Sequence, residues 1–565
     1  MNNNVKSNFF FSYHINEKRW KNTQLTWKTK LLITILFLSI ICVSMVMVGF
    51  QYSPYGTEIF IKNLKELFSF NSAIDLYPNN NLWNLSFEFL WKSIQGVIVG
   101  TTIGFVLAII SSYFVNYHFV RTKIANEIIK IILAILRALP TIVFIYFFKL
   151  NFGGRGSNVA LYLLYAWFSW LWLHKYMIEI YDSLNYYPYY VLRNQGCNRI
   201  ISYLKTIFFQ INNRFISLYL YSLESNMRWV SLLGVLGFIG IGQLISYAQS
   251  QNFSNMGIPV FVITIFMLFL EATIFLINRF LLIHKSFTFN KNKKIKFYFN
   301  YKVFIKWFLL LLIIILFLVS IITMSINQYA DLNNSFISGL FSPNWSILSS
   351  KNNLFLDILM LFFQSISIMF IAIFISLILI FISAFKLFKY YSIFGISITT
   401  IIRSFPMVAL FFILNPLYSS PISSICVILA IGSATIISKN IGELINKIDN
   451  RIINYYVMQG YSKISIFFKY VLFYIHLEFW SIVLFEFESK FRDLITYGSY
   501  GASSIGASID NYQSKGNYIN MAPFIWISFF ITLFMIIINY LIKFFLIEKR
   551  TININYFIKI LLWRK

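Results

Sequence analysis

The sequence predicts an all-α polytopic membrane protein, and three observations lead to this fold class. Hydrophobic residues make up 58% of the 565 residues and charged residues only 12%, whereas an ordinary soluble domain carries about 25% charged residues. A soluble chain of this length has no single core large enough to bury so much apolar surface. Apolar runs of about 20 residues, the length that spans a bilayer as a helix, recur along the chain. We therefore expect lipid to surround most of the molecule.

The apolar runs form two sets of about six, which gives about twelve predicted transmembrane helices. The first set comprises Leu31–Phe50, Ser93–Phe114, Ile128–Leu150, Asn158–Ile180, Phe215–Ile239 and Gly257–Leu281. The second set comprises Trp307–Ile326, Leu354–Phe381, Ile393–Leu414, Ile422–Ile441, His476–Ile495 and Ala522–Leu546. A basic segment separates the two sets.

The distribution of Lys and Arg predicts the orientation. The net charge is +27, but the basic residues are scattered between apolar runs and form no basic domain, so nucleic acid is not an expected partner. They gather before the first run, between the two halves and in the C-terminal tail, which places both termini and the central linker in the cytoplasm. The first run lacks a small-residue cleavage pattern, so we expect a retained helix and no cleaved signal peptide.

Matched motifs in the two halves predict an internal duplication. Arg137-Ala138-Leu139-Pro140 corresponds to Arg403-Ser404-Phe405-Pro406. The other matched pairs are Glu179 with Glu443, Gln195-Gly196 with Gln459-Gly460, Glu224 with Glu488, Arg228 with Arg492, and Gly234, Gly237 and Gly242 with Gly498, Gly501 and Gly506. Parallel repeats pack about an axis along the membrane normal, which places the pathway between them. The predicted organisation is an N-terminal cytoplasmic segment (1–30), a first repeat (31–283), a basic cytoplasmic linker (284–306), a second repeat (307–546) and a cytoplasmic tail (547–565).

These motifs resemble those of ABC importer permeases of the phosphonate/phosphate type. The stretch from Glu224 to Arg228 and the glycines after it are similar to that family's Glu-x-Asn-x-Arg helix and Gly-rich tail, and Arg403-Ser404-Phe405-Pro406 is similar to its Arg-Ser-x-Pro segment. The resemblance covers most of both halves. It implies the type I ABC importer permease fold, two six-helix units fused in one chain, and a phosphonate, phosphate or other phosphorylated substrate.

The resemblance also implies the partners. Glu179–Gln210 and Glu443–Tyr474 resemble the cytoplasmic coupling loops that dock on the ATPase, which implies docking roles for Glu179, Gln195, Gly196, Glu443, Gln459 and Gly460. The Glu-Ala-Ala that names the loop is absent from both copies, and so is the Pro at its end. The implied partners are two copies of an ABC ATP-binding subunit, which would carry the ATP and Mg, an extracytoplasmic substrate-binding protein, and the lipid bilayer of the plasma membrane.

Charged residues inside the apolar runs are the candidate pathway residues, because a charge at mid-bilayer costs about 2.5–3.5 kcal/mol. Glu224 and Arg228 share a helix face at a spacing of four residues, as do Glu488 and Arg492. In one interpretation these pairs neutralise each other and brace the helices. In the other they line the pathway. Arg137 and Arg403 then have no local acid, and such arginines suit an anionic substrate.

Prolines and glycines inside the runs predict helix geometry. Pro140 and Pro406 each remove a backbone donor in mid-span and predict a kink. The matched glycines from Gly234 to Gly242, and from Gly498 to Gly506, predict close helix packing.

No sequence signature of an enzyme stands out. The chain has no GxxxxGK[ST], HExxH or GxSxG motif, and its three cysteines are far apart. We therefore expect no catalytic, cofactor-binding or metal-binding residues on this chain. Two alternatives to an ABC permease remain open. One is an ion-gradient-driven secondary transporter, marked by an intramembrane acid without a basic partner, such as Glu271. The other is a membrane scaffold that transports nothing.

Overall fold

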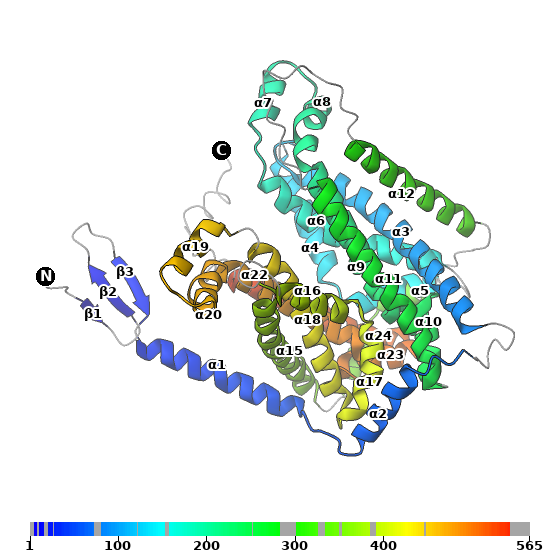
Figure 1. Cartoon of the computed structure of the whole chain (residues 1–565). Helices are drawn as coiled ribbons and strands as arrows, with labels where there is room; N and C mark the ends of the chain where they lie inside the picture. Colours follow the sequence, from blue (N-terminus) through cyan, green and yellow to red (C-terminus); the bar gives the residue numbers. More distant parts are fainter. Residues whose placement is uncertain are drawn as a thin grey trace.

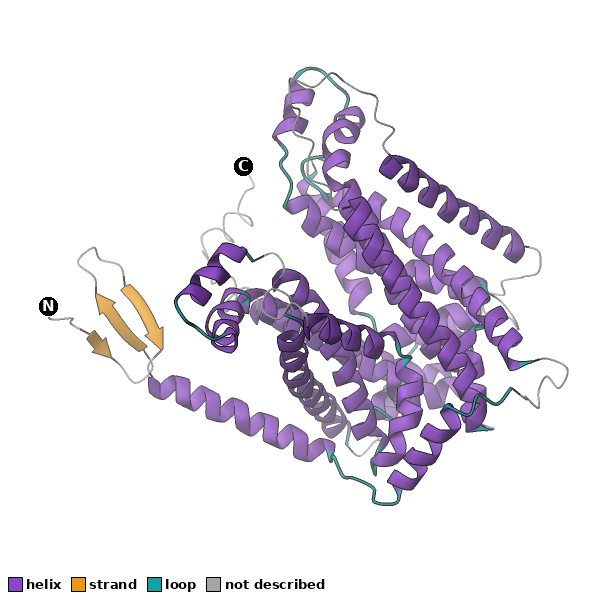
Figure 2. Cartoon of the chain, in the orientation of Figure 1, coloured by secondary structure: helices purple, strands orange, loops and turns teal. Residues whose placement is uncertain are grey.

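The computed structural model is helical apart from a small sheet near the N-terminus. It describes residues 5–7, 11–15, 21–25, 27–72, 81–120, 122–152, 158–250, 252–282, 301–325, 334–349, 353–384, 391–445 and 448–542. The tail 547–565 and most of the linker 284–306 lie outside these residues. The sheet is antiparallel, in the order β1 (Val5–Ser7), β2 (Phe11–Ile15) and β3 (Lys21–Leu25), and it was not anticipated from the sequence. Figure 2 shows it next to the N-terminal end of α1 (Trp27–Val48).

The first half runs from α1 to η3. Its elements are α1 (Trp27–Val48), α2 (Gly56–Leu67), α3 (Leu82–Val115), α4 (Lys123–Ala138), α5 (Thr141–Phe152), α6 (Val159–Asp182), α7 (Tyr187–Asn194), α8 (Arg199–Ser202), η1 (Tyr203–Ile207), α9 (Phe208–Val235), α10 (Ile241–Ser250), η2 (Phe253–Met256), α11 (Gly257–Leu276) and η3 (Ile277–Leu282). α9 continues directly from η1, so the chain crosses the molecule here without a break.

The second half follows a similar succession. Its elements are α12 (Tyr301–Ser325), α13 (Asn334–Phe341), α14 (Ser346–Ser349), α15 (Leu354–Ser383), α16 (Tyr391–Ser404), α17 (Met407–Leu414), η4 (Asn415–Leu417), α18 (Pro421–Ile445), α19 (Asn450–Met458), α20 (Lys463–Ile466), η5 (Phe467–Val471), α21 (Leu472–Tyr474), α22 (His476–Thr496), η6 (Tyr497–Tyr500), α23 (Ser504–Ser514) and α24 (Tyr518–Ile542). Here the chain bends by 70° at the break between α21 and α22, whereas in the first half η1 continues into α9 without a break.

By length and composition, between six and nine segments of the described chain are able to cross a membrane. Six single helices pass this test, and three bent helix pairs bring the number to nine. The chain is therefore a polytopic helical protein, whereas twelve spans remain a prediction. The predicted spans in α6, α9 and α12 are not among the nine, and the apolar part of α12 that the structure describes, Trp307–Thr323, is shorter than the others. α9 carries Arg214, Glu224 and Arg228, which lower its mean hydropathy.

The predicted spans Ile128–Leu150 and Ile393–Leu414 are wrong as single helices. α4 and α5 meet at 84°, and α16 and α17 meet at 86°. Leu139, which precedes Pro140, has an extended backbone with ψ of 133°, because a proline ring disfavours the helical region for the residue before it. Pro406 itself is extended, with ψ of 122°. The prolines therefore mark sharp breaks between two helices, a larger effect than the kink that we predicted.

The first helix of each half packs against the other half. α1 lies along α15, and α12 lies along α3 (Figure 1). The chain after α1 also pairs with the second half, since the Ser53 amide donates to the Leu417 carbonyl at 2.9 Å and the Ser419 amide donates to the Gln51 carbonyl at 3.0 Å. The two halves are therefore interleaved at their edges.

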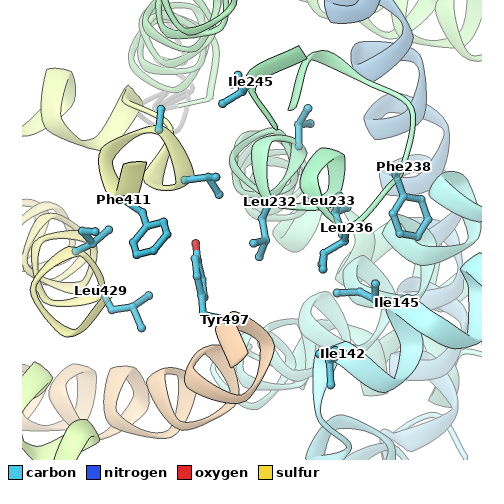
Figure 3. Close-up of a cluster of buried hydrophobic side chains, with 14 of the residues drawn as sticks. Ile142, Ile145, Leu232, Leu233, Leu236, Phe238, Ile245, Phe411, Leu429 and Tyr497 are labelled. Carbon is cyan, nitrogen blue, oxygen red and sulfur yellow. The ribbon is translucent and has the colours of Figure 1, made fainter. Parts of the chain in front are cut away.

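A continuous apolar core joins the halves. Figure 3 shows part of it, with Ile142 of α5 and Leu232 of α9 from the first half, and Phe411 of α17 and Tyr497 of η6 from the second. All four side chains are buried. The helices around this part of the core, α5, α10 and α17, lie away from the turns α7–α8 and α19–α20 (Figure 1).

Candidate functional site

A cavity of about 960 Å³ lies between the two halves. Its walls come from α4, α6 and α9 of the first half and from α18, α22 and α24 of the second. It reaches Glu179 and Glu443, both exposed, near the ends of α6 and α18 that lead to the turns α7–α8 and α19–α20. The cavity therefore extends toward the side of these turns. Its aromatic wall residues include Phe168, Trp172, Tyr176, Trp229, Phe485 and Tyr540.

A buried charge cluster ties the halves together beside this cavity. We call it the closed cluster, and it consists of Glu224, Arg228, Glu271, Arg403 and Lys439. Arg403 of α16 donates from Nη2 to Glu224 Oε1 at 2.6 Å and from Nη1 to Glu271 Oε1 at 3.3 Å. Lys439 Nζ of α18 donates to Glu224 Oε2 at 3.4 Å and to Glu271 Oε1 at 3.2 Å. Arg228 donates to Glu224 from the same helix. Both acids belong to the first half, so two cations of the second half bridge α9 and α11.

The closed cluster changes two expectations. Glu271 was the candidate for an acid without a basic partner, and the structure pairs it with Arg403 and Lys439. Arg403 was expected to have no local acid, and it contacts two. Sequence reasoning missed Lys439. A usable signal was present, because Lys439 precedes Glu443 by the same spacing as Lys175 precedes Glu179.

The corresponding residues of the other half line the cavity. Glu488 and Arg492 of α22 pair at 3.6 Å. On the same helix Lys490 contacts Asp493 at 2.8 Å and Glu486 at 3.9 Å. The Arg492 guanidinium also donates to the Arg137 carbonyl at 3.1 Å, which links α22 to the end of α4. These groups form a polar wall along one side of the cavity.

Two cations of the wall lack a carboxylate partner. The Arg137 side chain makes no hydrogen bond or ion pair with the described residues, and its Nε is buried without an acceptor. Lys175 of α6 places its Nζ 4.5 Å from the centre of the Phe485 ring, and no carboxylate of the described chain lies within ion-pair distance of it. The lining has four cations, Arg137, Lys175, Lys490 and Arg492, and five acids, Glu179, Glu443, Glu486, Glu488 and Asp493. The anionic-substrate interpretation assumed a net positive lining, and this expectation is wrong for the described residues.

The predicted docking loops are two surface turns. Gly196 lies between α7 and α8 with φ of +87°, and Gly460 lies between α19 and α20 with φ of +82°. Gln195 and Gln459 cap the helices that precede them. A left-handed backbone is costly for residues other than glycine. A Cβ at either glycine would meet no atom within 4 Å, so the need for glycine here is conformational.

The two turns present apolar side chains to the outside. Tyr187 and Ile200 around the first turn are 74% and 60% exposed, and Met458 and Ile464 around the second are 87% and 56% exposed. Figure 1 shows the turns at separate corners of the molecule. Both turns therefore carry exposed apolar side chains on the short helices next to their glycine.

The matched glycines form two close backbone contacts. A Cβ on Gly234 would lie 2.3 Å from the backbone of Gly242, and a Cβ on Gly498 would lie 2.3 Å from the backbone of Gly506. In each half the chain thus folds back on the end of the long helix. Gly237 and Gly501 make the left-handed turns between these pairs, with φ of +91° and +84°.

Two mycoplasma proteins are similar to this chain over most of its length. The ABC transport system permease protein p69 of Mycoplasma genitalium is 28% identical over 528 residues, which cover 91% of this chain and 93% of the relative. The protein of the same name from Mycoplasma pneumoniae is 26% identical over 486 residues, which cover 83% and 86%. No protein-family profile and no solved structure matches this chain.

Proposed function

We propose that this chain is the membrane-spanning permease of an ATP-driven importer, with two permease units fused in one polypeptide. The observation that carries the proposal is the arrangement of two glycine turns, at Gly196 and Gly460, on the same side of the molecule as a cavity between the halves. The similarity to two ABC transport system permeases along most of the chain supports the same class.

The two turns are the docking sites for ATP-binding subunits. Each offers a short exposed helix with apolar residues, and each connects directly to helices that line the cavity, α6 and α9 in one half and α18 and α22 in the other. Two turns call for two ATP-binding subunits, which would bind the ATP and Mg. Movement of the turns would then change the cavity through these helices.

The cavity is the pathway in its inward-facing state. We assign the buried apolar core around Phe411 and Tyr497 as the closure away from the docking turns. Closure of two ATP-binding subunits would bring the turns together, close the cavity at Glu179 and Glu443, and open the core for a solute that an external binding protein delivers. In this cycle the docking turns face the cytoplasm. The distribution of Lys and Arg supports a cytoplasmic location for both termini as well, in a protein of the plasma membrane.

A phosphonate, phosphate or other phosphorylated metabolite is the substrate class that we propose. Support comes from Arg137 and Lys175, two cavity cations without a carboxylate partner among the described residues. An ion-gradient-driven transporter remains the second candidate. Its expected mark was an intramembrane acid without a basic partner, and Glu271, the candidate for that acid, is paired with Arg403 and Lys439.

Purification of the tagged full-length chain in mild detergent tests the proposal. We expect an ATP-binding subunit to copurify in stoichiometric amount with ATPase activity. Gly196→Val and Gly460→Val should each reduce its recovery, because a β-branched residue opposes a positive φ. Gly516→Val is the matched control, since Gly516 has φ of +66° and open space around it but lies between α23 and α24. A pure chain that recruits no ATPase and moves solute down an ion gradient in liposomes would favour the second candidate.

A further inference from the structure

We propose that Arg137 and Lys175 bind the oxyanion of the transported solute, and that the closed cluster is the same arrangement with a protein carboxylate in the place of that oxyanion. The inference rests on the proposed function, because it assigns the substrate site of the cavity. The two halves would then have different roles, one as a permanent brace and the other as the solute site.

Four of the five residues of the closed cluster have a counterpart at the cavity. The cavity residues Glu488 and Arg492 are each numbered 264 higher than Glu224 and Arg228 of the closed cluster, and Lys439 is numbered 264 higher than Lys175. Both lysines lie over a ring on the long helix of the other half: Lys439 Nζ is 5.6 Å from the Tyr221 ring centre, and Lys175 Nζ is 4.5 Å from the Phe485 ring centre. Tyr221 and Phe485 are also 264 apart.

One member of the closed cluster has no counterpart at the cavity. Pro259 of α11 and Pro523 of α24 are 264 residues apart, so the two helices align in sequence at the same offset as the charged residues. In that register Glu271 corresponds to Met535, a buried methionine. α24 approaches the end of α4, since the Thr532 hydroxyl donates to the Ala138 carbonyl. Of the two carboxylates that hold Arg403 and Lys439, the counterpart of Glu224 is present at the cavity as Glu488, and the counterpart of Glu271 is absent.

Glu488 and Glu179 act on Arg137 and Lys175 from beyond ion-pair distance, so the two cations have no hydrogen-bonded carboxylate among the described residues. An unpaired buried charge is unfavourable, and a buried guanidinium without acceptors is satisfied only by water or a ligand. The other lining cations, Lys490 and Arg492, have acids within 4 Å. Arg137 and Lys175 do not, within the described chain. A guanidinium and an ammonium together suit an oxyanion such as a phosphate or phosphonate, to which the guanidinium presents a planar fork of donors.

The acidic mouth of the cavity limits the negative charge of the solute. Glu179 and Glu443 are exposed at its rim, whereas Arg137 is half-buried at the end of α4. The aromatic walls, including Trp172 and Trp229, offer apolar surface to the rest of a solute. The site therefore suits a molecule with one anionic group and an uncharged or cationic remainder better than a polyanion.

Binding of inorganic phosphate to the purified full-length chain tests the inference, at constant ionic strength and with choline chloride as a cationic comparison. We expect saturable phosphate binding by calorimetry. Arg137→Gln and Lys175→Gln should each weaken it about tenfold or more, because each removes a charge-assisted hydrogen bond. Lys439→Gln, the matched change in the closed cluster, should leave the affinity within about twofold.

Met535→Glu is the sharpest variant, because it restores the acid of the other half. We expect it to abolish phosphate binding, and Met535→Gln to retain it. The inference is refuted if the wild-type chain binds no phosphate, if Arg137→Gln and Lys175→Gln bind as tightly as wild type, or if Lys439→Gln loses binding equally. Copurification of the ATPase is a separate readout. If the chain binds phosphate but copurifies with no ATPase, the oxyanion site is supported and the ATP-driven permease is refuted. If an ATPase copurifies but phosphate does not bind, the permease is supported and the oxyanion site is refuted.

Discussion

Removal of the central carboxylate of the closed cluster is the strongest test of how the halves are held together. Glu224 is fully buried and contacts three cations, Arg228 and Arg403 and Lys439. The change Glu224→Gln keeps the size of the side chain and removes its charge. It leaves three cations around a neutral amide, with Glu271 as the one remaining acid of the cluster.

The expected loss of stability is about 3–5 kcal/mol, the usual cost of removing one partner of a buried ion pair. The matched control is Glu88→Gln. Glu88 pairs with Lys92 at 2.7 Å, also four residues apart, but its side chain is 56% exposed. Exposed pairs contribute about 0–1 kcal/mol. The structure therefore predicts a difference of at least about 2 kcal/mol between two chemically identical changes.

Equilibrium unfolding in detergent measures both variants. The double variant Glu224→Gln with Arg403→Gln should lose less than the sum of the two single variants, since the second change removes a cation that the first left unpaired. Equal stability of Glu224→Gln and Glu88→Gln, or strict additivity of the pair, would show that the cluster does not bind the halves, and the reasoning would fail.

Three further predictions follow from other contacts. Gly242→Ala should destabilise the chain by about 1–3 kcal/mol, because its Cβ would lie 2.5 Å from the Val230 carbonyl. Gly442→Ala, in open space within α18, should be neutral or stabilising by up to about 1 kcal/mol in the same unfolding assay. Burial lowers the pKa of His118, with Asp182 opposing, and its ring contacts the Tyr190 hydroxyl at 2.5 Å. A His with a lowered pKa in the folded state loses stability as pH falls below its unfolded value of about 6.5. The first docking turn should therefore become more sensitive to limited proteolysis at pH 5.5 than at pH 7.5, and His118→Phe should remove this dependence. Pro406→Ala should reduce the 86° bend between α16 and α17, which distance measurements between spin labels on the two helices would detect. An unchanged distance would assign the bend to packing alone.

The sequence by itself determined the features that depend on neighbouring residues. Apolar composition predicts the helical membrane protein, because lipid accepts only segments whose backbone hydrogen bonds are internal. The Glu–Arg spacing places Glu224 beside Arg228. Gly196 and Gly460 mark tight turns, because glycine adopts the positive φ of such a turn without strain. These are interactions within one helix or one turn, so their geometry is fixed locally.

Only the tertiary structure decided which distant residues meet. Arg403 lies 132 residues from Glu271 and 179 from Glu224, and no local pattern specifies these partners. The placement of α1 along α15, the right-angled breaks at the prolines and the mixed charge of the cavity were not predicted either. The physical reason is that apolar helices are equally soluble in lipid on every face. Their partners are chosen by close packing and by the few polar contacts that the whole assembly can satisfy at once.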